Sequence, residues 1–297
     1  MSEHFTSRVE AYAAPQQADI ARRAGLADDV VGALAAGAAA LAVAAVGAVA
    51  AMVEALREQA RKEATQLRAL AGQSVGHGRL AQELASSRAL LGALERPEFF
   101  LLRAAAERDT PAGVAKLAQR LSSLEVRSRS RRSDIPALAA ESANAKRELD
   151  RAVQEGVGRL LRAEASLLHD AAAATLSDMG YEISRPKQTT GSRVVLRGSS
   201  ETGTGVYVQI DPGRGQLSAD FSGFQGTACV KERDRFLQGL ADRGIRVRLL
   251  ARDLHGRPEG GTLARDLAPH FAGVNDQEQD RQRRAALARR LRTPGGS

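Results

Sequence analysis

Apolar residues recur every three or four positions along most of the first 179 residues, which is the spacing of one face of an α-helix. The clearest run is Val46, Val49, Val53 and Leu56, and the spacing continues as far as Leu70. It passes from an uncharged Ala-rich stretch into a charged one without a change of phase. The pattern predicts an Ala-rich helix over residues 27–73 that packs in a bundle or a coiled coil.

Three further helices follow from the same spacing. A helix over 79–108 carries leucines on one stripe, and Pro97 should kink or break it because proline disfavours the helical conformation of the preceding residue. A second helix covers 111–126, and a long one covers 136–179 and ends at Gly180. The long helix spans about 65 Å with one apolar face. Its face therefore needs a partner, either the N-terminal helices or a second copy of the chain.

After Gly180 the spacing changes from helical to alternating. Val206, Val208 and Ile210 alternate with Tyr207 and Gln209, as in a strand with one buried face. Short strands of the same kind are expected near residues 181–184, 193–197 and 217–221. An amphipathic helix over 227–243 and a strand over 245–250 come next. This order predicts a small antiparallel β-meander that is flanked by helices.

The whole chain is therefore expected to be an α+β protein in four parts. Residues 1–26 form a polar N-terminal lead, 27–165 the helical region, and 166–252 a small α+β domain. Residues 253–297 form a flexible basic tail, within which 262–271 has the pattern of one short helix.

The uncharged stretch Val30–Val53 has two interpretations. Its 24 residues are long enough to span a membrane, but half of them are alanine, which contributes almost nothing to insertion. The main interpretation is a helix buried in a bundle, and the alternative is a membrane tether. The single cysteine, Cys229, excludes an intramolecular disulfide framework and fits a cytoplasmic location, with membrane association as the alternative.

The formal net charge is +8, and two segments concentrate arginine. Such segments can bind phosphates or anionic lipid headgroups, and otherwise they are a solvated loop and a solubilising tail. The first segment follows the helix over 111–126, and the second lies in the C-terminal tail. The candidate anion-binding residues are Arg127, Arg129, Arg131, Arg132, Arg281, Arg283, Arg284, Arg289, Arg290 and Arg292.

The sequence contains none of the common catalytic motifs, such as HExxH, GxxxxGK[ST], GxSxG or CxxC. The five histidines are scattered without metal-ligand spacing. The glycines of residues 198–205 loosely resemble a phosphate loop, but no helix follows them, so we interpret them as a hairpin loop. We expect no enzyme activity, no cofactor, no metal site and no small-molecule substrate.

These observations favour a non-enzymatic scaffold or adaptor. Its helical region would be elongated and self-associating, and its small α+β domain would contact a protein partner. One alternative is the same architecture tethered to a membrane through Val30–Val53. A second alternative is a nucleic-acid-binding protein that uses the two arginine segments.

Overall fold

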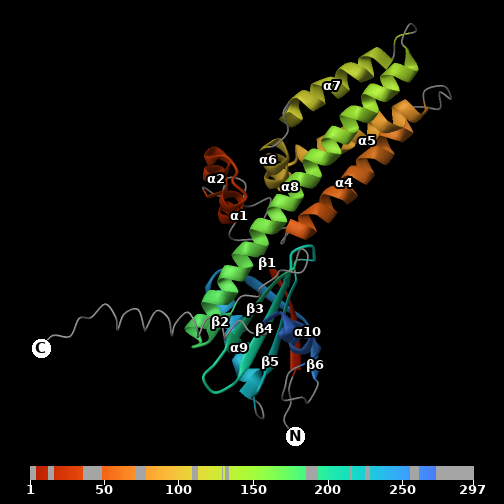
Figure 1. Cartoon of the computed structure of the whole chain (residues 1–297). Coiled ribbons are helices and arrows are strands. Elements are labelled where there is room, and N and C mark those ends of the chain that lie inside the picture. The colour runs from red at the N-terminus through yellow and green to blue at the C-terminus, as the bar shows by residue number, and fades with distance from the viewer. Residues whose placement is uncertain are drawn as a thin grey trace, which may run out of the picture. The chain divides into compact units, whose positions relative to one another are not determined.

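A computed structural model of the chain describes residues 5–12, 17–35, 49–70, 78–108, 113–128, 130, 134–184, 193–214, 216–224, 228–254 and 261–271 (Figure 1). The chain is a mixed α+β protein, as predicted, and divides into two compact units. The helical unit comprises residues 12–167 and 212–215. The sheet unit comprises residues 1–11, 168–211 and 216–297.

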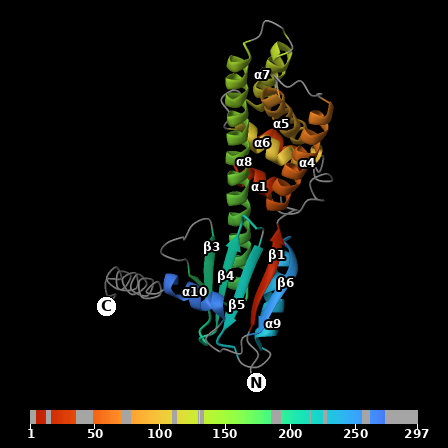
Figure 2. The same cartoon turned by 90° about the vertical axis from the view of Figure 1, so that its right-hand side faces the viewer.

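The helical unit is built from short N-terminal helices and a group of longer ones (Figure 2). The long helix α8 contributes to it as far as Leu167. Helix α4 packs along α5, which also contacts α6 and α7. The elements are α1 (Gln17–Arg23), α2 (Asp28–Ala35), α4 (Val49–Leu70), α5 (Gly78–Leu94), the 3₁₀ turn η2 (Pro97–Phe99), α6 (Phe100–Arg108), α7 (Gly113–Ser128) and α8 (Ile135–Asp178).

The apolar stripes predicted from the sequence form the core of this unit. In α4, the residues Val49, Val53 and Leu56 are buried, and in α8 both Leu149 and Leu160 are fully buried. Packing within one chain therefore covers the stripes that pointed to a second copy. The leucine stripes of the shorter helices are also buried: Leu80, Leu84, Leu91 and Leu94 of α5, and Val114, Leu117, Leu121 and Leu124 of α7.

The helix expected over 79–108 is interrupted at Pro97, as predicted. Arg96 is extended, with φ −71° and ψ 143°, and Pro97 opens the 3₁₀ turn η2. The interruption follows from the clash between the proline ring and a helical residue before it. It allows α5 and α6 to pack separately.

Helix α8 crosses α6 at very short range. A Cβ placed on Gly156 would lie 2.8 Å from the backbone nitrogen of Ala106 and 2.9 Å from the carbonyl carbon of Ala105. Only glycine allows this approach, because neither backbone atom can move independently of its helix. Gly156 thus fixes the distance between the two helices.

The sheet unit contains a six-stranded sheet in the order β2-β3-β4-β5-β1-β6 (Figure 2). Strands β2 to β5 form the predicted antiparallel meander. Helices of the unit are the end of α8, α9 (Ala228–Asp242) and α10 (Thr262–Phe271). The strands are β1 (Phe5–Tyr12), β2 (Glu182–Ser184), β3 (Val194–Ser199), β4 (Gly205–Asp211), β5 (Gln216–Ser222) and β6 (Arg246–Leu254).

The N-terminal segment differs from the expected polar lead over residues 1–26. Strand β1 lies in the sheet between β5 and β6, with Thr6 opposite Asp220 and Glu10 opposite Gln216 on antiparallel β5. Residues 17–23 form α1, in which Ile20 and Ala21 are buried. The sequence of β1 contains few apolar residues, and its partner strand lies about 200 positions away, so no local pattern marks it.

The two faces of the sheet are covered by different helices. Phe221 of β5 packs edge-on against Phe236 of α9, and Leu176 at the end of α8 lies against Gly198 of β3. Tyr207 points to the opposite face, because side chains alternate along β4, and there it contacts α10. The short helix expected over 262–271 is thus α10, an integral part of the unit and not a tail.

The interpretation of Val30–Val53 concerns residues that are only partly described. Its first residues belong to α2 and its last to α4, while 36–48 lie outside the described residues. None of the helices in the described ranges combines the length and the apolar character that a membrane span requires.

The first prediction concerns the crossing of α6 and α8. Gly156→Ala should lower the free energy of unfolding by about 1–3 kcal/mol, because its Cβ collides with backbone atoms of α6. Gly158→Ala is the matched control on the same helix. Its Cβ would meet only the flexible guanidinium of Arg162, at 3.4 Å, so it should be neutral or stabilise by up to about 1 kcal/mol. Equal urea-unfolding curves for the two variants would contradict this packing.

The second prediction concerns β1. Deleting residues 1–12 removes the strand between β5 and β6, so the backbone amides of β5 that pair with β1 should lose their protection from hydrogen exchange. The thermal transition of the sheet unit should fall or disappear. Deletion of residues 281–297 is the control and should leave both measurements unchanged. Full protection of β5 without residues 1–12 would show that β1 is dispensable.

Candidate functional site

The predicted arginine segments are represented among the described residues by Arg127 alone. It lies at the end of α7, exposed, with its Nη1 2.9 Å from Oε2 of Glu141 on α8. This ion pair offsets part of its charge, so Arg127 is a weak starting point for an anion site. The other nine candidates lie outside the described residues: Arg129, Arg131, Arg132, Arg281, Arg283, Arg284, Arg289, Arg290 and Arg292.

The described residues contain no group of three or more His, Cys, Asp or Glu side chains that could hold a metal ion. His169 on α8 has its Nδ1 3.1 Å from Oδ1 of the neighbouring Asp170. Cys229 is buried in the first turn of α9. Neither residue is part of an array that resembles a nucleophile with its base.

Residues 198–205 form the hairpin that joins β3 and β4, in agreement with the interpretation of this glycine-rich segment. Hydroxyl groups close it: Ser200 Oγ lies 2.6 Å from Thr204 Oγ1 and 2.8 Å from Thr202 Oγ1. The Ser200 amide donates to the Thr204 carbonyl at 2.9 Å, and Gly203 supplies the left-handed turn at φ +83°. The hydroxyls thus bond to one another within the turn, which gives the hairpin a structural role.

The most perturbed titratable side chain in the sheet unit is Tyr181, which precedes β2. Its hydroxyl donates to Oε1 of Glu232 on α9 at 3.1 Å. Burial raises the pKa of Tyr181, and the negative charge of Glu232 raises it further. A tyrosine held neutral in this way is a poor base and a poor nucleophile. The pair therefore fastens the start of β2 to α9.

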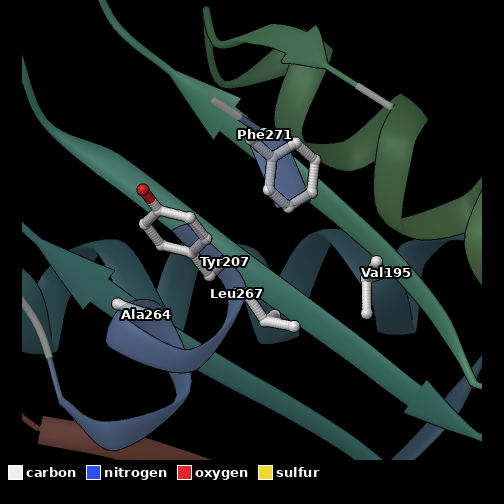
Figure 3. Close-up of a cluster of buried hydrophobic side chains, with 5 residues drawn as sticks. All are labelled: Val195, Tyr207, Ala264, Leu267 and Phe271. Atoms are coloured by element: carbon white, nitrogen blue, oxygen red, sulfur yellow. The ribbon is translucent and has the colours of Figure 1, made fainter. Parts of the chain in front are cut away.

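A second buried polar contact fixes α10 on the sheet. Asp220 of β5 is fully buried, and its Oδ2 accepts a hydrogen bond from the backbone amide of Ala264 at 2.9 Å. Beside it, the rings of Tyr207 and Phe271 meet edge-on with centroids 6.1 Å apart (Figure 3). A carboxylate at the start of a helix satisfies a free amide and complements the helix dipole. Asp220 is therefore committed to holding α10.

The surface feature best suited to recognition is a cleft of about 250 Å³ between α5 and α7, which we call the α5–α7 cleft. Buried leucines form its floor, and an ion pair between Arg88 and Glu125 spans it. Glu95 at its rim is exposed and has no ion-pair partner within the described part of the chain. The lining residues are Leu84, Arg88, Leu91, Gly92, Glu95, Ala118, Leu121, Ser122 and Glu125.

Val126 extends this surface along α7. It lies four residues after Ser122, so the two side chains are neighbours on the helix surface. Val126 is 70% exposed and is the one large apolar side chain of that exposure in the described chain. Sequence reasoning missed the cleft, because it depends on which two helices pair. The available signal was the set of small residues, Gly92, Ala118 and Ser122, beside the leucine stripes.

Comparisons with known proteins add no functional information. No protein-family model matches the chain, and neither do curated proteins or solved structures. The functional argument therefore depends on the geometry described above.

The third prediction concerns the alkaline stability of the sheet unit. Because the pKa of Tyr181 is raised above its usual value near 10, its stabilising effect is complete below pH 10. That effect should be lost as the pH rises beyond 10. Tyr181→Phe should reduce stability near neutral pH by about 1 kcal/mol, through loss of the Glu232 hydrogen bond, and should lose less on moving to high pH.

Urea unfolding at pH 8 and pH 11 measures both effects. Tyr207→Phe is the matched control: it keeps Tyr181, so its stability should fall with pH as much as that of the natural chain. The same pH dependence in Tyr181→Phe as in the natural chain would contradict the assignment.

Proposed function

We propose that this protein is a non-enzymatic scaffold or adaptor, and that its helical unit binds a protein partner through the α5–α7 cleft. The observation that carries the proposal is the cleft itself, with its buried leucine floor, charged rim and adjacent exposed Val126. An apolar centre with a polar rim is the usual composition of a protein interface.

The size of the cleft favours side chains of a partner over a metabolite. Small-molecule sites usually enclose about 300–1,000 Å³. At about 250 Å³, this cleft has room for one or two large side chains. The free carboxylate of Glu95 favours a partner segment with a Lys or Arg beside its apolar residue, because such a pair matches both rim and floor.

The predicted coiled coil fits this proposal in a narrower form. The 3–4 spacing of α4 is satisfied by α5 and its neighbours in the same chain. We infer that the coiled-coil character belongs to the α4–α5 pair, and that self-association, if it occurs, uses the exterior of the bundle. The α5–α7 cleft with Val126 is then the surface that a second copy would use, and the small α+β domain remains a second interaction module.

The fourth prediction fills the cleft. Ser122→Trp places an indole over the leucine floor from an exposed position, so the fold should be retained and partner binding lost. Ser123→Trp is the matched control, one residue along α7, also exposed and outside the cleft lining. Proteins that bind the natural chain through the cleft should be retained by Ser123→Trp and lost with Ser122→Trp.

Sedimentation velocity of the three proteins at micromolar concentrations tests whether the partner is a second copy. A mass above 31.5 kDa that only Ser122→Trp reduces would identify self-association through the cleft. If every protein retained by the natural chain is also retained by Ser122→Trp, and sedimentation is unchanged, the cleft is not the binding surface.

A further inference from the structure

Four arginines from three helices gather along one side of α8 in the helical unit. Arg159 and Arg162 lie on α8 itself, Arg108 ends α6, and Arg23 ends α1. Positions 159, 162 and 166 share one face of α8, because they are three and then four residues apart. At 166, the serine hydroxyl accepts a hydrogen bond from Nη1 of Arg23 at 2.9 Å, which brings the first helix to this face.

The close crossing of α6 and α8 brings Arg108 to the same place. Gly156 lies directly against Ala105 and Ala106, so the end of α6 reaches α8 one turn before Arg159. The Arg108 guanidinium also donates to the carbonyl of Ala24 and lies against Gly25, beside Arg23. The four side chains are therefore held by backbone packing that the sequence separates by up to 139 positions.

The guanidinium groups lie close enough to act on one another. The pKa of Arg159 is lowered, first by its partial burial, then by the charge of Arg108 and then by that of Arg162. Neither Arg108 nor Arg162 has a carboxylate within ion-pair distance among the described residues. Arginines elsewhere in the unit differ in this respect, since Arg88, Arg103 and Arg120 each pair with a glutamate. The cluster is thus a concentrated positive charge on the surface.

We propose that Arg108, Arg159 and Arg162, with Arg23 at their edge, bind a phosphate-bearing ligand. Guanidinium groups form paired hydrogen bonds to phosphate oxygens, and several converging forks favour a group with more than one negative charge. Arg108 and Arg162 are exposed and can reach such a ligand, while Arg159 is partly buried and lies between them. Phosphate esters of this kind occur on soluble molecules and on lipid headgroups, and the test separates the two.

The test uses the full chain and inorganic tripolyphosphate as probe, with binding measured by calorimetry at low salt. Arg162→Gln is the main variant, because Arg162 is exposed and, unlike Arg108, does not hold another helix. It should weaken binding about tenfold or more, and Arg162→Lys should recover part of the loss, because the charge returns without the fork.

Two controls exclude other sources of binding. Arg57→Gln removes the same charge from an exposed arginine of α4 that pairs with Glu54, and it should bind within about twofold of the natural chain. A chain without residues 281–297 should also keep its affinity, which separates the cluster from the arginines of the C-terminal segment. Thermal unfolding without ligand confirms that each variant is folded.

The source of the phosphate is decided by co-sedimentation with vesicles of phosphatidylcholine, with or without 5% of a bisphosphorylated inositol lipid. Binding to the inositol vesicles that Arg162→Gln abolishes assigns the site to a lipid headgroup. Binding to tripolyphosphate alone assigns it to a soluble ligand. The proposal is overturned if the natural chain binds neither probe, or if Arg162→Gln and Arg57→Gln weaken binding equally.

Discussion

The structure depends on one helix, α8, whose apolar face supplies residues to two separate cores. Leu149 and Leu160 are fully buried in the helical unit, and Leu168 and Leu176 are buried in the sheet unit. A helix of this length is stabilised mainly by such packing and little by its own propensity. The close approach at Gly156 shows how specific the packing is, because a single added methyl group would collide with the backbone of α6.

Buried acids begin two of the helices that pack around these cores. Glu164 of α8 accepts a hydrogen bond from the amide of Val49, the first residue of α4, at 3.2 Å. Asp220 of β5 does the same for the first turn of α10. In each case a carboxylate removed from water is paired with an amide that no helical carbonyl can satisfy. The acids specify where α4 and α10 start, which apolar packing alone would leave free to slide.

Local patterns predicted most of this fold and none of its non-local features. The helices over 111–126 and 136–179, the break at Pro97 and the meander from β2 to β5 follow from spacing, proline and glycine signals within about ten residues. Strand β1 was missed because its stability comes from pairing with β5 and β6, not from its own weak pattern. The α5–α7 cleft and the cluster around Arg159 arise from pairings of distant helices, and a segment-by-segment interpretation does not show which helices meet.

This division explains why the linear arginine segments were the wrong place to begin a functional argument. Density along the sequence selected Arg127, which the fold places beside Glu141 and so partly neutralises. Arg108 and Arg162 lie in unremarkable sequence, yet the crossing at Gly156 sets them beside Arg159. Electrostatic recognition depends on the distance between charges in space, and that distance is fixed here by backbone contacts between α6 and α8. The positive charge that matters for a ligand is therefore a product of helix packing, and substitutions that loosen this crossing should weaken anion binding even where every arginine is kept.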